Sequence, residues 1–373
     1  MHNDELRSSI GPSGCSFIED IIDGMNDWVR VINTEGTLLF INKSMRLAIG
    51  ANSLGKKCYE VLGRTDPCSN CVTWHKQEKM MNLKEEVVNG RYYSISSSPL
   101  RNSYGEIEAY VEVFHDITEI RTISKMLEAQ NAKLKEDLMI ARRLQCNLLP
   151  KKNSLNDKLD FSYIYKPCET LGGDFLDIFK IDDSHVGIYI ADVSGHGVAA
   201  SMLTMFLRAA LDKSQLSPAK VLESLYNDFS KSGFDDDLYI AVFYGILNLE
   251  NYSLTYSNAG LNVVPIVFSK DKYQLLRLAG IPISTWVECP VYNEKIINIS
   301  PGDRLFFYTD GIIEIKNNKK EQFGEERLIS HIQESKDSPA KILSSLIDKA
   351  TSFAGTTSKD ILDDITVSIV EIK

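Results

Sequence analysis

A stretch with neither glycine nor proline, residues 119–149, divides the chain into two parts of different texture. Apolar residues recur in it every seven positions, and Pro150 ends it. The repeating positions are Ile120, Leu127, Leu134, Ala141 and Leu148, and Ile123, Leu138 and Leu144 widen the stripe. This pattern predicts an amphipathic or coiled-coil helix. Because Gln130, Asn131 and Asp137 interrupt the stripe, two interpretations stand: a seam between two copies of the chain, or a single helix lying on its own domain.

The stretch before this helix, residues 16–118, has the pattern of a small mixed domain. Two β-prone runs, 28–32 and 37–41, flank an Asn/Gly turn, which predicts a hairpin. Helical stretches are expected at 43–49 and 70–81, and three further strand-like runs close the segment. Two strands, then helices, then three strands make an α+β order.

The stretch after the helix, residues 150–373, is dominated by strand-like runs. Two apolar helical runs, 199–211 and 218–229, come between them. A sheet or sandwich flanked by helices is therefore expected.

Composition excludes several classes of partner and location. A chain of 373 residues suggests two or three domains, and its formal charge of -10 gives no electrostatic reason to bind nucleic acid or anionic lipid. No run of apolar residues is long enough to span a membrane, and the first ten residues lack the apolar core of a signal peptide. The seven cysteines, an odd number without a regular framework, favour a reducing cytoplasm.

Acidic residues of the last stretch share one context. Asp174 follows two glycines, Asp192 and Asp310 end strand-like runs, and Asp363 with Asp364 opens the final one. Carboxylates at strand ends can converge at one edge of a sheet, where they repel one another unless cations neutralise them. Oxygen ligands suit Mg²⁺ or Mn²⁺, and two such ions can clamp a phosphoryl group for attack by water. The residues therefore indicate a two-metal hydrolase of phosphate esters.

Four motifs around these carboxylates resemble the metal-dependent (PPM-type) protein phosphatases, in their bacterial branch of stress-response and sporulation phosphatases. The motifs are LGGDFLD (171–177), ADVSGHG (191–197), PGD with YTDGIIE (301–303 and 308–314) and DDITV (363–367), in the family's order. The resemblance begins at about Ala141. It implies an αββα sandwich, two Mn²⁺ or Mg²⁺ ions, and serine/threonine phosphatase activity in which metal-activated water attacks phosphorus.

The resemblance also implies roles for individual catalytic positions. Asp192 matches the aspartate that bridges both metals, and Val193 offers its backbone carbonyl. Asp174 matches a ligand of one metal, whereas Asp310 and Asp363 match ligands of the other.

For other positions in the motifs, the sequence leaves more than one role open. Asp364 is the alternative to Asp363 as a ligand, and Asp177 either belongs to the site or caps or pairs within its turn. His196 is a candidate general acid or a turn-stabilising residue. Ser194 is not expected to be a nucleophile, and Leu261 stands where the family usually has histidine.

The first stretch resembles a PAS sensor domain, and its VFHDITE close (113–119) resembles the PAS junction to output domains. The resemblance does not name a PAS ligand. Cys58, and the pair Cys68 and Cys71 with His75 nearby, allow three interpretations: a zinc site, redox-sensitive thiols, or reduced thiols in a loop.

The expected protein is thus α+β: a PAS domain (16–118), a coiled-coil linker (119–149) and an αββα phosphatase domain (150–373). We expect a cytoplasmic, homodimeric phosphatase, paired through the PAS domain and the linker, that acts on a phosphoprotein such as a STAS-type anti-sigma-factor antagonist. A signal would pass through the linker to the helical segment after Asp192. The alternative is a phosphatase-like scaffold that binds partners without hydrolysis; no P-loop or kinase glycine-rich loop is present.

Overall fold

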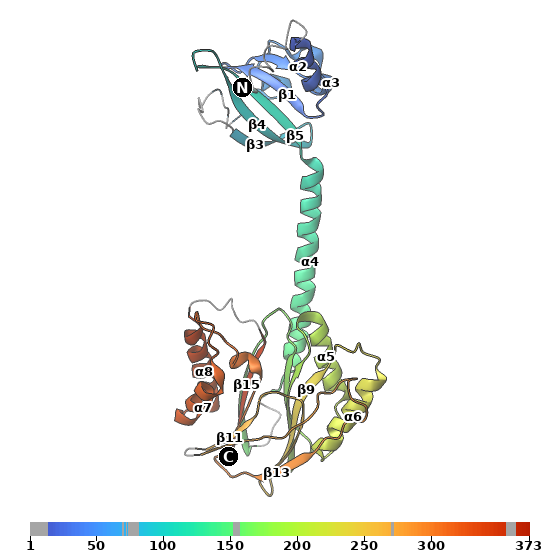
Figure 1. Cartoon of the computed structure of the whole chain (residues 1–373), viewed down its shortest axis with the longest axis vertical. Coiled ribbons are helices and arrows are strands. Elements are labelled where there is room, and N and C mark those ends of the chain that lie inside the picture. The colour runs from blue at the N-terminus through green and yellow to red at the C-terminus, as the bar shows by residue number, and fades with distance from the viewer. Residues whose placement is uncertain are drawn as a thin grey trace, which may run out of the picture. The chain divides into compact units, whose positions relative to one another are not determined.

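The computed structural model describes residues 14–68, 71, 73, 82–151, 157–269, 272–355 and 363–373. Two compact units make up the chain, Met1–Lys133 (unit 1) and Leu134–Lys373 (unit 2) (Figure 1). Both units mix strands and helices, which confirms the predicted α+β class. None of the helices in the described ranges combines the length and the apolar character needed to cross a membrane.

The described residues of unit 1 form one antiparallel sheet with the strand order β2-β1-β5-β4-β3. Its strands are β1 (Trp28–Asn33), β2 (Leu38–Ile41), β3 (Asn82–Val88), β4 (Arg91–Arg101) and β5 (Ile107–Asp116). Its helices are α2 (Gly14–Asp23) and α3 (Lys43–Ile49), with 3₁₀ turns at Ala51–Ser53 and Glu60–Leu62. The predicted hairpin is present as β1 and β2, which pair antiparallel. The helix expected at 70–81 lies almost entirely outside the described residues.

Helix α4 (Thr118–Leu148) runs from unit 1 into unit 2 without interruption. Most of its apolar stripe is exposed: Ile120, Ile123, Leu127, Leu134 and Leu144. Gln145 is its one buried residue. Most of the stripe is therefore left uncovered by the described residues of a single chain.

In unit 2 the residues that the structure describes form two five-stranded sheets. The β8 sheet has the order β13-β10-β9-β8-β7 and the β15 sheet has the order β12-β11-β14-β15-β6. The strands are β6 (Leu159–Lys166), β7 (Asp174–Lys180), β8 (His185–Val193), β9 (Ile240–Asn248), β10 (Ser253–Ala259), β11 (Ile266–Phe268), β12 (Tyr273–Leu275), β13 (Glu294–Asn298), β14 (Arg304–Tyr308) and β15 (Ile365–Ile372). All the pairings within these sheets are antiparallel.

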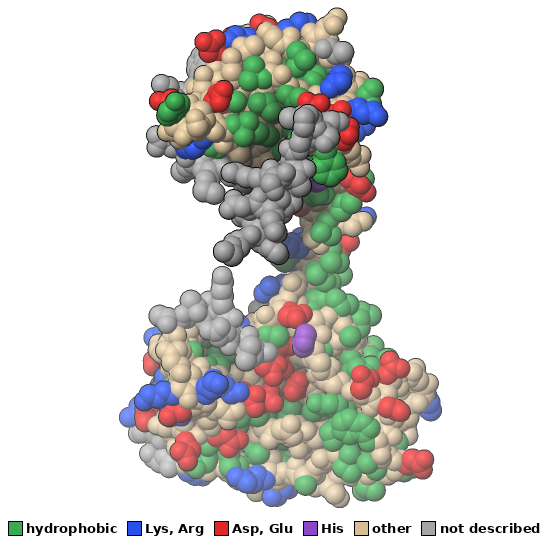
Figure 2. Space-filling model, turned by 45° about the horizontal axis from the view of Figure 1, so that its top comes forward, with side chains coloured by type: hydrophobic (Ala, Val, Ile, Leu, Met, Phe, Trp, Pro, Cys, Tyr) green, Lys and Arg blue, Asp and Glu red, His purple; other side chains and the backbone are tan. Residues whose placement is uncertain are grey.

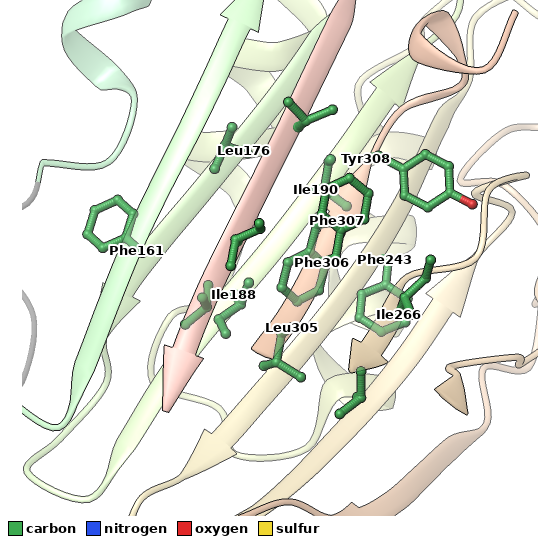
Figure 3. Close-up of a cluster of buried hydrophobic side chains, with 14 of the residues drawn as sticks. Phe161, Leu176, Ile188, Ile190, Phe243, Ile266, Leu305, Phe306, Phe307 and Tyr308 are labelled. Atoms are coloured by element: carbon green, nitrogen blue, oxygen red, sulfur yellow. The ribbon is translucent and has the colours of Figure 1, made fainter. Parts of the chain in front are cut away.

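The main core of unit 2 lies between its two sheets. Figure 3 shows Ile188, Ile190 and Phe243 of the β8 sheet packed against Leu305 and Phe307 of the β15 sheet, all buried. Burying one such aliphatic or aromatic side chain contributes roughly 1.5–3 kcal/mol to the stability of the fold. The sheets are thus fixed face to face, and so are the loops at their ends.

Two helix pairs cover the outer faces of the sandwich (Figure 1). They are α5 (Gly197–Ala210) with α6 (Pro218–Lys231), and α7 (Gly324–Glu334) with α8 (Pro339–Ala354). The first pair packs on the β8 sheet through a second apolar cluster that includes Leu203, Leu207 and Leu225, and α8 contacts β6 and β15. This is the predicted αββα arrangement. The sequence indicated α5 and α6 but not α7 and α8.

Candidate metal centre

Strands β7 and β8 place two carboxylates directly opposite each other. Asp174 is the first residue of β7, Asp192 is the second-last residue of β8, and the antiparallel register pairs them. Directly paired residues on antiparallel strands project to the same face of a sheet. Asp174 is 2% exposed and Asp192 is half-buried, so this carboxylate pair is partly withdrawn from water.

The adjacent end of the β15 sheet supplies two more carboxylates. Strands β14 and β15 pair antiparallel, Asp310 opens the 3₁₀ turn after β14, and Asp363 precedes β15. A Cβ at Gly311 would lie 2.0 Å from the carbonyl oxygen of Asp364. Only glycine allows this approach of the two loops, which brings Asp310 and Asp363 to the same end of the sheet.

These carboxylates influence one another strongly. Burial and then the charges of Asp310 and Asp363 raise the pKa of Asp192 to about 7. Burial and then the charge of Asp192 raise the pKa of Asp174 well above its ordinary value. Burial also raises the pKa values of Asp310 and Asp363, the former with help from the charge of Asp363. Figure 2 shows acidic side chains gathered on this face of unit 2 beside a histidine. Bound cations would relieve such repulsion.

The donors at this edge fit hard divalent cations, because all of them are oxygen atoms. A Cβ at Gly173 would lie 3.2 Å from the Val193 carbonyl oxygen, so glycine keeps the space beside this oxygen open. Among the described residues, no three His, Cys, Asp or Glu side chains converge closely enough to hold an ion as they stand. The carboxylates thus share one edge of the sandwich without forming such a group of three.

Asp364 lies beside this set and holds a loop, and its charge adds, after burial and the other carboxylates, to the raised pKa values of Asp192 and Asp174. Its carboxylate accepts hydrogen bonds from the backbone N–H groups of Cys168 (2.7 Å), Gly173 (2.5 Å) and Asp174 (3.3 Å). A carboxylate engaged by three amides has little capacity left for a cation. The geometry favours Asp363 over Asp364 as a candidate ligand.

Asp177, from the same motif as Asp174, pairs with basic side chains. Its Oδ2 accepts hydrogen bonds from Arg208 Nη1 (2.6 Å) and Lys213 Nζ (2.7 Å). Asp177 is 4% exposed, so this ion pair is largely shielded from solvent. Its contacts are those of a residue that ties β7 to α5 and the following loop.

Two residues beside the carboxylates were not indicated by the sequence. Thr309, fully buried, donates a hydrogen bond from Oγ1 to Asp174 Oδ2 (2.6 Å) and accepts one from the Thr366 N–H (3.0 Å). Tyr239 lies close enough that Asp192 is, after burial, the next cause of its raised pKa. The only signal for Thr309 was its place next to Asp310 in the motif.

The glycine-rich turn after Asp192 carries the other motif residues. His196 Nδ1 lies 2.9 Å from Glu169 Oε1, and both side chains are exposed. Ser194 Oγ accepts a hydrogen bond from the Tyr239 N–H (2.9 Å), which is a structural role. Leu261 donates its backbone N–H to Asn258 Oδ1 (3.1 Å) in a turn and is buried.

The cysteines singled out in unit 1 form a separate group. Cys58 and Cys71 are buried, and Cys68 is half-buried. His75 lies outside the described residues.

Comparison with protein families gives two matches. The profile of stage II sporulation protein E (SpoIIE) matches residues 182–373, and a profile described as PAS fold matches residues 22–122. The first covers more than half of the chain.

Three curated relatives show the same similarity. Phosphoserine phosphatase RsbU of Bacillus subtilis is 23% identical over 243 residues, which are 64% of this chain and 70% of RsbU. Phosphoserine phosphatase RsbP of the same organism is 28% identical over 188 residues, 48% of this chain and 46% of RsbP. Protein IcfG of Synechocystis is 26% identical over 236 residues, 56% of this chain and 37% of IcfG. The chain therefore spans less than half the length of two of these relatives.

Solved structures match the fold. The SiaA-PP2C domain of Pseudomonas aeruginosa superimposes with a TM-score of 0.58 at 20% identity, over 66% of this chain and 99% of that domain. A SpoIIE fragment from Bacillus subtilis, its PP2C phosphatase domain with part of the regulatory domain, gives a TM-score of 0.50 at 15% identity, over 80% of this chain and 84% of the fragment.

Proposed function

Because the chain belongs to the stage II sporulation protein E family, we propose that it is a metal-dependent protein serine/threonine phosphatase. The observation that carries the proposal is the set of mutually repelling carboxylates at one edge of the sandwich, where burial and neighbouring charges raise the pKa of Asp192 to about 7. We assign residues 150–373 to the phosphatase, residues 16–118 to a PAS sensor and residues 119–149 to the linker between them.

The proposed cation site uses oxygen atoms from both sheets. Asp192 would be shared between two Mn²⁺ or Mg²⁺ ions, Asp174 and the Val193 carbonyl would help to hold one of them, and Asp310 with Asp363 would hold the other. Bound ions of this kind lower the pKa of water and neutralise charge on a phosphoryl group during in-line displacement. The chain's own residues hold and orient these ligands.

Two contacts outside the ligand set orient Asp174. The Thr309 hydroxyl fixes its Oδ2, and the Asp364 carboxylate fixes its backbone N–H. Such supporting hydrogen bonds set ligand direction and basicity.

The proposed substrate is phosphoserine or phosphothreonine on a small partner protein, such as a STAS-type anti-sigma-factor antagonist. Two relatives are named phosphoserine phosphatases, which supports this class. An exposed aromatic side chain beside the carboxylates supports a protein rather than a small molecule. Trp286 is 55% exposed, lies 5.2 Å from the Tyr239 ring between centroids, and is anchored by a 2.7 Å hydrogen bond to the Asp236 carbonyl.

We propose that the PAS sensor regulates the site through α4, in a homodimer paired along the exposed stripe of this helix and through the PAS domain. Buried Gln145, near the end of α4, supports this route. Its Nε2 donates to the Gly172 carbonyl (2.8 Å) and to Thr204 of α5 (3.3 Å), and its Oε1 accepts from the Gly172 N–H (3.3 Å). Gly172 lies two residues before Asp174, so a shift of α4 would reach a proposed ligand. We also place the protein in the cytoplasm, where thiols are kept reduced.

The phosphatase proposal is tested by hydrolysis of an aryl phosphate and of a phosphoprotein with and without Mn²⁺. Asp192→Asn and Asp310→Asn should each lower the Mn²⁺-dependent rate by roughly 100-fold or more, because several kcal/mol of transition-state stabilisation are lost. Asp348→Asn, on the exposed face of α8, is the matched control and should retain the wild-type rate. A wild-type chain that binds the phosphoprotein but never hydrolyses it would establish the scaffold alternative instead.

The coupling proposal is tested in α4. Leu127→Lys with Leu134→Lys should abolish the dimer in sedimentation and change the hydrolysis rate, whereas Lys135→Gln should do neither. An unchanged rate in the monomeric variant would exclude coupling through this helix.

A further inference from the structure

Two cysteines and three basic side chains, among them Arg64, gather around one cavity of unit 1, and a third cysteine, Cys71, lies beside Cys68. Cys58, Cys68 and Lys84 line one cavity together with Arg30. Cys68 is hydrogen-bonded to Cys71, and Lys84 Nζ donates to Cys68 Sγ at 3.1 Å. Next to this pair of contacting thiols, the ammonium group of Lys84 favours the thiolate form of Cys68.

The surroundings of this pair are ionic. Arg30 Nε donates to Glu112 Oε2 at 2.6 Å, and both side chains are almost fully buried. Lys84 Nζ lies 3.9 Å from Glu86 and 4.0 Å from Glu112. The cavity has a volume of about 10 Å³, room for a single water molecule. The described residues around this cavity therefore supply charges and thiols.

The two thiols differ in exposure in a way that suits sequential exchange. Cys68 is half-buried, so a small molecule can reach it, whereas Cys71 is buried next to it. The thiol of Cys71 also lies 3.0 Å from the Thr73 hydroxyl. An accessible attacking sulfur and a sheltered neighbouring sulfur are what disulfide formation within one chain requires.

We propose that Cys68 and Cys71 form a reversible dithiol–disulfide pair that takes a low-molecular-weight disulfide as its oxidant. The Cys68 thiolate attacks one sulfur of the oxidant, whose S–S bond breaks and releases one small thiol. The sulfur of Cys71 then attacks Cys68, the mixed S–S bond breaks, and a second small thiol leaves. The protein loses two protons and two electrons, and the oxidant gains both.

Lys84 is a positioning residue in this proposal. The hydrogen bond with Cys71 and burial raise the pKa of Cys68 well above its ordinary value, and the hydrogen bond and charge of Lys84 offset only part of that rise. Removing the ammonium group would therefore make the Cys68 thiolate rarer and its attack slower. Oxidation takes away the thiolate that Lys84 stabilises, which leaves Glu86 and Glu112 as its anionic neighbours.

A metal site is the competing interpretation of these cysteines. No three His, Cys, Asp or Glu side chains in the described part of unit 1 are arranged to hold an ion. His75, the remaining candidate ligand, lies outside the described residues, so metal binding is an outcome that the experiment distinguishes.

The test uses the full chain and oxidised glutathione as the probe. Trypsin places Cys68 and Cys71 in one peptide, residues 65–76, and Cys58 in another, residues 58–64. We expect the 65–76 peptide to lose two hydrogen atoms in mass after oxidation and to regain them with dithiothreitol. Cys71→Ser should stall at the mixed disulfide, with one glutathione on Cys68, and Cys289→Ser, an exposed control, should behave as wild type.

The role of Lys84 is read from the rate of Cys68 alkylation against pH. Lys84→Met should slow it about 10-fold at neutral pH, with the profile displaced to higher pH, and Lys84→Arg should restore most of the rate. Because this alkylation measurement does not need the Cys71→Ser variant, it still tests the proposal if that variant does not fold. The proposal is overturned if the 65–76 peptide never closes, if Cys68 pairs with Cys58, or if stoichiometric Zn²⁺ protects both thiols from alkylation and oxidation.

Discussion

Thr309 Oγ1 donates a 2.6 Å hydrogen bond to Asp174 Oδ2. Thr309 follows β14 in one sheet and Asp174 begins β7 in the other, so this bond joins the two sheets at the carboxylate edge. This hydrogen bond engages Oδ2 of Asp174 and not Oδ1. A single buried hydroxyl thus sets the direction of a proposed ligand.

Thr309→Val should weaken cation binding. The substitution keeps the side-chain volume and removes the donor to Asp174 and the acceptor for the Thr366 N–H. Losing a supporting hydrogen bond of this kind costs about 10–100-fold in metal affinity. The measurement is the Mn²⁺ concentration at half-maximal hydrolysis, with Thr309→Ser as the control that retains the hydroxyl. Equal Mn²⁺ requirements for the two variants would contradict this role.

Asp192→Asn should stabilise the metal-free protein while it abolishes activity. Burial and the charges of Asp310 and Asp363 oppose the ionised form of Asp192. A neutral amide removes that repulsion, so the free energy of unfolding in EDTA should rise by roughly 1–3 kcal/mol at pH 8. Urea unfolding of wild type, Asp192→Asn and the control Asp348→Asn checks this. Mn²⁺ should stabilise wild type more than Asp192→Asn, and a destabilised metal-free variant would contradict the repulsion.

Trp286→Ala should lower the rate of hydrolysis of protein substrates and leave the rate on small substrates unchanged. A truncated aromatic contact at the centre of an interface typically costs about 2 kcal/mol, or roughly 30-fold in kcat/KM for the phosphoprotein. Hydrolysis of an aryl phosphate should be unchanged, because Trp286 is not among the proposed ligands. Tyr273→Ala, an exposed aromatic residue on β12, is the matched control. Parallel losses on both substrates would show that Trp286 supports the fold of the site instead.

Glu112→Gln should destabilise unit 1 in a pH-dependent way. Burial raises the pKa of Glu112, but the charges of Arg30 and Lys84 and the hydrogen bonds to Glu112 outweigh it and hold this pKa below its ordinary value. The stabilisation by Glu112 is therefore present above the ordinary glutamate pKa and is lost as pH falls through the lowered value.

At pH 7 the variant leaves Arg30 buried and unpaired, at a cost of about 3–5 kcal/mol. This difference should shrink below about pH 4, as wild-type Glu112 is protonated. Hydrogen exchange of the β1 and β5 peptides measures this loss of stability within unit 1. The control Glu108→Gln, an exposed position on β5, should match wild type. A difference that stays constant down to pH 3 would rule out the charge of Glu112 as its origin.

Much of the fold was predictable because its signals are local. The hairpin of β1 and β2 and the helices α5 and α6 follow from turn residues and apolar periodicity, and the motifs placed acidic residues at strand ends. Helix α7 was missed because only Leu328 and Ile332 of its residues are buried, too few to give a periodic signal among its charges.

The supporting contacts of the site were not predictable, because they depend on tertiary register. Asp363 and Asp364 are adjacent and identical in type, and only the fold shows that Asp364 accepts three backbone N–H groups. The pairing of Asp177 with Arg208 and Lys213 likewise joins residues more than thirty positions apart. Sequence motifs indicated the proposed ligands, whereas the residues that hold them emerge only from packing.

The hydrogen bonds that the Asp364 carboxylate accepts from the amides of Cys168, Gly173 and Asp174 have a consequence for biosynthesis. These loop residues are translated nearly two hundred positions before the side chain that fixes them. A ribosome-bound chain that has not yet produced β15 therefore cannot shape the Asp174 loop. Catalytic competence should arise abruptly as this strand inserts between β6 and β14, and nascent intermediates should be inert toward phosphoproteins in the cell.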